Sequence, residues 1–149
     1  MSPAHPSAGY LLDTNVLSEL MRPAPAQEVL RWFGGAVTSQ LHMSAINQAE
    51  ILAGIAALPA GRRRDALALA AQEIFEDEFA GRCLAFGSTA AEQFALVTAT
   101  RKRAGRPIDT VDAQIAAIAL AAQLGLVTRN TRDFEGIEGL EVVNPWQPN

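Results

Sequence analysis

The segment LLDTNVLSEL, residues 11–20, decides the fold class, because an aspartate stands in it where an apolar run ends and a helical pattern begins. Tyr10–Leu12 is a short uncharged run that predicts a buried strand. Apolar residues then recur at the spacing of a helix: Val16, Leu17, Leu20 and Met21. Pro23 and Pro25 end this helix. Asp13 is therefore expected at the carboxyl end of a strand, either as a helix N-cap or as a functional acid.

Strands and helices continue to alternate along the chain. Further strands are predicted around Val37–Met43, Cys83–Phe86, Leu126–Thr128 and Leu140–Val143. Helices are predicted at about Ala26–Phe33, from the N-cap Ser44 to just before Pro59, over Arg62–Phe79, over Ser88–Arg103, and from Asp109 to Gly125. The apolar positions expected to face inward on these helices include Leu52, Leu69 and Leu96. This order favours an α/β fold in which helices cover both faces of a parallel sheet, with ligands bound beyond the carboxyl ends of its strands.

Length and composition predict one soluble globular domain. The chain has 149 residues, of which 49% are hydrophobic and 19% charged, enough to bury a continuous core. We expect a flexible N-terminal tail over residues 1–9 and the domain over residues 10–149. No window is apolar enough to span a membrane and the start lacks a leader, which predicts a cytoplasmic protein without a membrane partner. Cys83, the single cysteine, has no internal disulfide partner and is expected to be buried.

Charge argues against a protein that coats nucleic acid by bulk electrostatics, since the formal net charge is −4. The cations nevertheless fall into three groups, which are Arg62–Arg64, then Arg101, Lys102, Arg103 and Arg106, and finally Arg129 with Arg132. Each group alone is typical of a solvated helix face or loop. Arg129 and Arg132 flank Asn130 directly after a predicted strand, so they are the candidates to steer a phosphate backbone towards a site there.

Four polar residues, distant in the chain, are expected at one edge of the sheet. Asp13 and Asn130 follow strands, Asp112 lies in the first turn of its helix, and Glu50 lies in the early turns of another. Each alone can be a cap or a solvated helix position. However, Glu50 and Asp112 stand in otherwise uncharged helices, and clustered carboxylates repel unless a cation joins them. Oxygen ligands without His or Cys favour Mg²⁺ or Mn²⁺, whose open positions suit phosphodiester hydrolysis.

Five segments in this order and spacing resemble the PIN-domain ribonucleases of the VapC toxin type, in particular their FitB-like branch. The segments are LLDTNVLSEL (11–20), SAINQAEILAGI (44–55), GRPIDTVDAQIAAIAL (105–120), LVTRNTRDF (126–134) and VVNPW (142–146). The resemblance implies a three-layer α/β/α fold with a central, mainly parallel sheet. It also implies a Mg²⁺-dependent endoribonuclease, Mn²⁺ being an alternative metal, that acts as a toxin on RNA. Its partners would be an antitoxin encoded by a neighbouring gene and a second copy of the chain in a dimer.

The resemblance assigns roles by motif position. It places Asp13, Glu50, Asp112 and Asn130 in the catalytic site, the first three as metal ligands. Thr14 and Asn15 are expected to bond to the first acid or to bound water, and Asp133 is a further candidate for support. Asp109 is an additional acid where the family more often has small residues, and we interpret it as a helix N-cap.

Two other functions are compatible with parts of this pattern. A phosphatase with a strand-end aspartate as nucleophile generally has a second aspartate two residues later, and Asn15 stands at that position. A catalytically inactive PIN-like module that binds RNA or protein is the main alternative. The presence of Asp13, Glu50 and Asp112 together argues against it.

Overall fold

The computed structural model describes residues 9–147, so residues 1–8 of the expected tail lie outside the described residues, as do residues 148 and 149. Gly9, which the sequence predicts as the last residue of that tail, is instead buried. Its carbonyl accepts a hydrogen bond of 3.0 Å from the backbone N–H of Gly125. Gly9 has a φ of +104°, and a Cβ there would come within 2.0 Å of the Gln40 carbonyl oxygen. Only glycine fits this entry to the first strand.

A five-stranded parallel sheet forms the centre of the fold, as predicted, with the strand order β3-β2-β1-β4-β5. The strands are β1 (Tyr10–Leu12), β2 (Leu41–Ser44), β3 (Cys83–Leu84), β4 (Gly125–Val127) and β5 (Val142–Val143). Three are shorter than expected. β2 begins only at Leu41 because Thr38–Gln40 forms a 3₁₀ turn, and the edge strands β3 and β5 have two residues each. Leu12 pairs with Val127, which brings the carboxyl ends of β1 and β4 together.

Six α-helices connect and cover the strands. They are α1 (Thr14–Leu20), α2 (Gln27–Gly34), α3 (Ala45–Ala56), α4 (Arg62–Glu73), α5 (Ser88–Arg103) and α6 (Thr110–Ala121). The helix predicted over residues 62–79 is an α-helix only to Glu73 and continues as a π turn over Ile74–Glu78. Across residues 9–147 the structure has no helix that combines the length and the apolar character needed to cross a bilayer.

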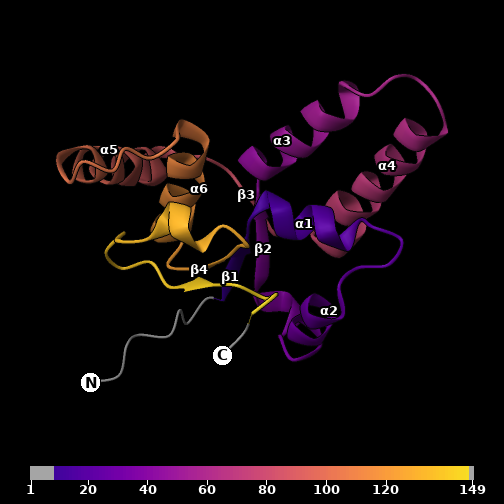
Figure 1. The fold of residues 1–149 in the computed structure, drawn as a ribbon, viewed down its shortest axis with the longest axis horizontal. Coiled ribbons are helices and arrows are strands. Elements are labelled where there is room, and N and C mark those ends of the chain that lie inside the picture. Colours follow the sequence, from indigo (N-terminus) through magenta and orange to yellow (C-terminus); the bar gives the residue numbers. More distant parts are fainter. Residues whose placement is uncertain (1–8, 148–149) are drawn as a thin grey trace.

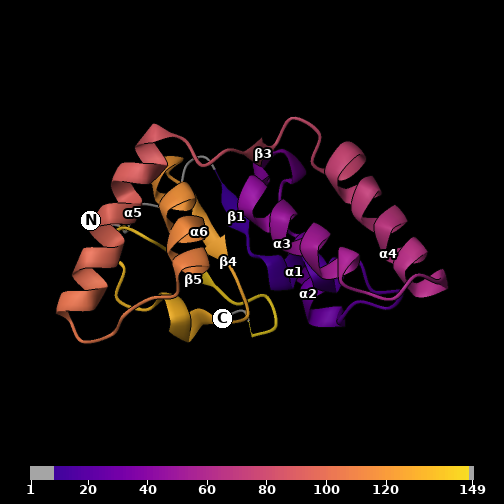
Figure 2. The same cartoon turned by 90° about the horizontal axis from the view of Figure 1, so that it is seen from above.

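Leu11 and Leu12 show why the sheet has helices on both sides. These successive residues of β1 are fully buried in two different cores. Leu11 packs with Ile115 and Ile118 of α6, whereas Leu12 belongs to a core with Leu17 of α1. Strand side chains point alternately to the two faces, so β1 anchors both layers. Figures 1 and 2 show α5 and α6 on one side of the strands, with α1, α2 and α4 on the other.

Three apolar residues that we expected to face inward are exposed. Leu52 of α3, Leu69 of α4 and Leu96 of α5 have exposed fractions of 48%, 59% and 60%. The spacing of apolar residues predicts which face of a helix is buried only when the other faces are polar. These helices have apolar residues on several faces, and spacing alone could not tell which face the core. Cys83, expected to be buried, is exposed on the edge strand β3.

Candidate active site

Asp13 is a buried carboxylate held by three hydrogen bonds. It directly follows β1 and is 5% exposed. Its Oδ1 accepts from the backbone N–H of Thr14 at 2.8 Å, which makes Asp13 the N-cap of α1. Its Oδ2 accepts from the Thr128 hydroxyl at 2.8 Å and from the Asn15 amide at 3.3 Å. Burial raises the pKa of Asp13, the Thr128 and Thr14 hydrogen bonds oppose that rise, and the charges of Glu50 and Asp133 add to it.

Thr128 joins the two central strands at this edge. It is fully buried, and its hydroxyl oxygen accepts from the Asn15 amide at 3.2 Å and from the backbone N–H of Asn130 at 3.0 Å. The Asn15 carbonyl oxygen in turn accepts from the backbone N–H of Arg129 at 3.1 Å. Thr128 was not predicted as a site residue. The feature that could have identified it is its position directly after a strand, which places it beside Asp13 in the parallel register.

Glu50 reaches the same site from α3. Its side chain is exposed, and Oε1 accepts a hydrogen bond of 2.6 Å from the Thr14 hydroxyl. The helix that positions it begins as predicted, with Ser44 as N-cap. Ser44 and Asn47 form a capping box, in which each side chain bonds to the backbone N–H of the other residue. Thr14 links Glu50 to Asp13, because its hydroxyl donates to Glu50 and its backbone N–H donates to Asp13.

Asp112 lies in the first turn of α6, as predicted, and its pKa is raised to about 6. Partial burial is the largest cause. The charges of four other carboxylates add to it, those of Asp13, Asp109, Asp133 and Glu50. Acids from four parts of the chain therefore lie within electrostatic range of one another.

The remaining polar residues predicted near the site are Asn130, Asp133 and Asp109. Asn130 precedes the 3₁₀ turn Thr131–Phe134, and its side chain is exposed. Asp133 lies in that turn, and its charge raises the pKa of both Asp13 and Asp112. Asp109 accepts a hydrogen bond of 3.2 Å from the backbone N–H of Val111, which confirms our interpretation of it as the N-cap of α6.

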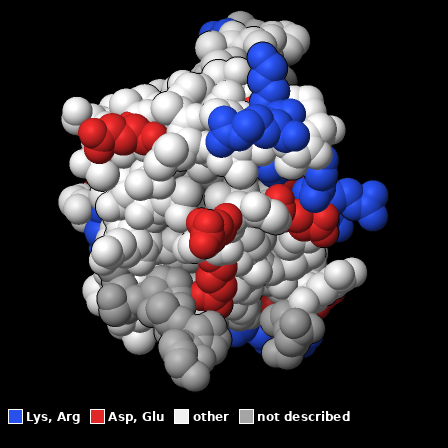
Figure 3. Space-filling model, turned by 90° about the vertical axis from the view of Figure 1, so that its left-hand side faces the viewer, with Lys and Arg blue, Asp and Glu red and all other residues white. Residues whose placement is uncertain are grey.

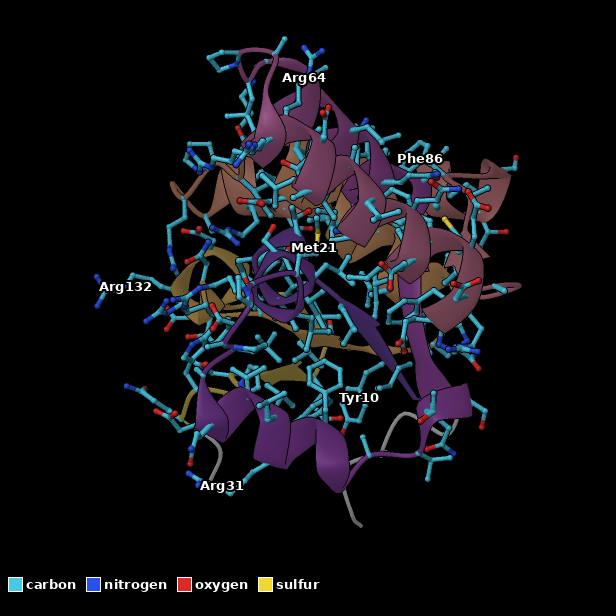
Figure 4. All side chains as sticks on the ribbon, turned by 90° about the vertical axis from the view of Figure 1, so that its right-hand side faces the viewer. Tyr10, Met21, Arg31, Arg64, Phe86 and Arg132 are labelled. Atoms are coloured by element: carbon cyan, nitrogen blue, oxygen red, sulfur yellow. The ribbon has the colours of Figure 1, made fainter. Side chains whose placement is uncertain are left out.

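The predicted cationic groups do not form one surface. Arg64 and Arg132 lie far apart, and Arg132 extends away from the body of the protein (Figure 4). On the face in Figure 3, Lys and Arg side chains gather beside Asp and Glu side chains. Arg106 pairs with Glu135 at 3.2 Å. The Arg129 guanidinium lies 4.7 Å from the centre of the Trp146 ring. The group at Arg62–Arg64 is therefore separate from the group that contains Arg132.

Arg101 belongs to the interior and not to a steering surface. It is 7% exposed, and its guanidinium donates to three backbone carbonyls. Nε donates to Arg106 at 2.8 Å, and Nη1 donates to Asp133 at 3.0 Å and to Glu135 at 3.3 Å. These bonds tie the end of α5 to the turn that contains Asp133. The grouping of Arg101 with the other cations was wrong, because adjacent positions in sequence face different sides of a helix end.

The candidate metal ligands at this edge are all oxygen atoms. Carboxylate, hydroxyl and amide oxygens are ligands for hard divalent cations, Mg²⁺ and Mn²⁺ among them. Besides burial, neighbouring carboxylates raise the pKa of Asp13 and of Asp112. Among residues 9–147, however, no three His, Cys, Asp or Glu side chains are already arranged to hold a metal. The donor set fits such a cation, and its carboxylates would have to move closer to bind one together.

Residues 10–140 match the PIN domain family. Because this match covers most of the chain, the protein belongs to that family. The parallel sheet and the acids at its carboxyl edge agree with the resemblance noted from the five sequence segments.

Within the family, the chain is similar to named toxins and ribonucleases along almost its whole length. The plasmid stability protein StbB of Pseudomonas syringae pv. tomato is 42% identical, over 92% of this chain and 98% of its own length. The VapC ribonuclease Y4jK of Sinorhizobium fredii is 39% identical, over 93% and 98%. Toxin FitB of Neisseria gonorrhoeae is 35% identical, over 91% and 97%. The crystal structure of FitAcB from Neisseria gonorrhoeae superimposes with a TM-score of 0.85 at 35% identity, over 93% of this chain and 99% of that one.

Proposed function

We propose that this chain is a Mg²⁺-dependent endoribonuclease that acts in the cytoplasm as the toxin of a toxin–antitoxin module. The observation that carries the proposal is the gathering of acids from four parts of the chain at the carboxyl edge of the sheet, where Thr14 bonds to both Asp13 and Glu50. Partial burial and the repulsion of four neighbouring carboxylates raise the pKa of Asp112 there to about 6. Such mutual repulsion destabilises a folded domain unless a cation offsets it. The similarity to the VapC ribonuclease Y4jK supports RNA as the substrate.

We propose roles for the site residues from their motif positions, and the place of each side chain in the structure supports them. Asp13, Asp112 and Glu50 would hold the metal, which supplies a Lewis acid and an activated water for in-line attack on a phosphodiester. Asn130 would orient water or a phosphate oxygen without adding negative charge. Thr14 and Asn15 hold the carboxylates of Glu50 and Asp13 through their hydrogen bonds.

Two further contributions concern charge around the site. Asp133 adds negative charge near Asp13 and Asp112 and supports cation binding there. Arg129 and Arg132 would contact the phosphate backbone of RNA, since a cation beside an acidic site offsets the repulsion between that site and the substrate. Arg129 is the better placed of the two, because Asn15 holds its backbone and its guanidinium lies over Trp146.

An RNA cleavage assay tests the enzymatic part. Purified protein should cut RNA with Mg²⁺ or Mn²⁺ and should not cut it in EDTA. Asp112→Asn should be inactive while keeping the wild-type circular dichroism spectrum. Equal cleavage with and without EDTA would contradict the metal mechanism. RNA binding without any cleavage would favour the inactive module.

The partner would be an antitoxin encoded by a neighbouring gene, and we propose that the toxin forms a dimer, alone or within that complex. The similarity to toxin FitB and to the structure of FitAcB supports this part. Expression of this chain alone should arrest growth, and co-expression of the neighbouring gene should relieve the arrest. Arrest that persists although the two proteins copurify would show that the neighbour does not neutralise the chain.

A further inference from the structure

Asn47 is a fully buried polar side chain that the proposed roles leave out. Its Oδ1 faces two groups of Ser44, the backbone N–H at 3.0 Å and the hydroxyl at 2.7 Å. A backbone N–H can only donate, so the atom of Asn47 that faces it must be the oxygen. The amide nitrogen must then point the other way, where it donates to the Thr14 hydroxyl oxygen at 3.0 Å.

The orientation of the Asn47 amide determines where the Thr14 hydroxyl donates. Because the Thr14 oxygen accepts from the Asn47 amide, its hydrogen is directed to another acceptor, the Glu50 carboxylate at 2.6 Å. Glu50 is otherwise an exposed side chain with several rotatable bonds. This hydrogen bond limits its freedom and leaves its second carboxylate oxygen available to a ligand.

Capping of α3 explains the side-chain oxygen of Asn47 but not its amide nitrogen. The capping box uses Oδ1 of Asn47 and the Ser44 hydroxyl, and it makes no use of the amide nitrogen. Residues at this position of a capping box are usually Glu or Gln, which reach back to the N-cap and need no donor. Among residues 9–147, the amide nitrogen has one hydrogen-bond acceptor, the hydroxyl of Thr14, a residue 33 positions earlier in the chain.

We propose that Asn47 is a positioning residue, which orients the Thr14 hydroxyl and thereby holds Glu50 in place to bind the divalent cation. The inference rests on the proposed function, because it assumes that Glu50 is a metal ligand. Residues that orient metal ligands typically change metal affinity about 10- to 100-fold when they are replaced. Asn47 should therefore affect metal binding in the absence of RNA.

Calorimetric titration of Mn²⁺ into the purified full chain, without RNA, tests this role. Asn47→Leu removes the donor at similar volume and should weaken Mn²⁺ binding by about tenfold. Ser44→Ala is the matched control, because it removes the hydroxyl of the same capping box and leaves the amide nitrogen of Asn47 on Thr14. It should bind Mn²⁺ with close to wild-type affinity. Circular dichroism melting in EDTA checks folding, and Asn47→Ala replaces Asn47→Leu if the latter does not fold.

A double-mutant cycle separates the pathway through Thr14 from a general effect on α3. Thr14→Val should weaken Mn²⁺ binding by about as much as Asn47→Leu, and the double variant should be no weaker than Thr14→Val alone. Wild-type affinity in a folded Asn47 variant, or losses that multiply in the double variant, would overturn the inference. An absence of Mn²⁺ binding by the wild-type protein would overturn the proposed function, and this inference with it.

Discussion

Asp13 and Asp112 are two acids of one site with opposite surroundings. Asp13 is almost completely buried and accepts hydrogen bonds from Thr14, Asn15 and Thr128. Asp112 is only partly buried, and among the described residues no hydrogen bond reaches its carboxyl group. Hydrogen bonds to the charged form oppose the effect of burial on the pKa of Asp13, whereas burial and neighbouring acids act on Asp112 unopposed.

The difference indicates that the fold positions the two acids in different ways. The ends of β1 and β4 hold Asp13 rigidly, in a position that the parallel register determines. Asp112 lies on a helix that brings it near the other acids, where its charge is destabilising without a counter-ion. One half of the site is therefore preorganised by hydrogen bonds, and we expect the other half to depend on the cation.

The largest expected effect is on catalysis, from Asp13→Asn. RNA cleavage should fall by more than about 100-fold, because loss of a ligand exceeds the usual effect of losing a residue that only orients one. Asp112→Asn should reduce cleavage to a similar extent. In EDTA the melting temperatures of the two variants should differ. Asp13→Asn should lower the melting temperature because it disturbs a hydrogen-bonded network, whereas Asp112→Asn should melt at a higher temperature than Asp13→Asn because it removes repulsion between carboxylates. Thermal melting of both variants checks this, and a lower melting temperature for Asp112→Asn than for Asp13→Asn would contradict the contrast.

The next largest effect concerns the turn beside Asp112. Arg101→Met should lower the free energy of unfolding by about 2–3 kcal/mol, because the carbonyls of Arg106, Asp133 and Glu135 lose a charged donor. Arg103→Met is the matched control on the exposed end of α5, and it should change stability by less than about 0.5 kcal/mol. Urea denaturation measures both. Equal effects would show that Arg101 does not hold this turn.

A smaller effect tests the rigid half of the site. Thr128→Val keeps the shape of the side chain and removes the hydroxyl that donates to Asp13, so we expect a loss of about 1 kcal/mol in stability. Thr98→Val is the control, because the Thr98 hydroxyl is buried and, within residues 9–147, has no hydrogen-bond partner. Thr98→Val should be neutral or stabilising. Urea denaturation that ranks the two variants in the opposite order would contradict the network at Asp13.

The smallest expected effect is the pH dependence of the half of the site that contains Asp112. The pKa of Asp112 in the folded protein, about 6, lies above its ordinary value of 3.8, so the folded state binds this proton more tightly than the unfolded state. The destabilisation is complete above about pH 6 and is relieved as the pH falls towards about 4. In EDTA, the stability of the wild type relative to Asp112→Asn should therefore rise as the pH is lowered from about 7 to about 5. Melting curves that show the reverse would exclude this environment for Asp112.

Much of this arrangement could be predicted from the sequence, because it depends on patterns local to each segment. A charge directly after an apolar run located Asp13 at a strand end, and the helix signals located Asp112, Asp109 and the start of α3. Thr128 and Asn47 were missed because uncharged polar residues stand out only when their partners are known. Burial of Arg101 depends on carbonyls from a turn more than 30 residues away, which no local pattern contains.

A crystal structure of the wild-type protein with Mn²⁺, with anomalous scattering data, tests the central claim most directly. We predict one strong anomalous peak at the carboxyl edge of the sheet, coordinated by carboxylate oxygens of Asp13 and Asp112 and with Glu50 in its coordination sphere, directly or through water. Asp112 should move closer to Asp13, and the position of Asp13 should hardly change. A fully loaded crystal with no peak at this edge, or with a peak coordinated by other residues, would contradict the account.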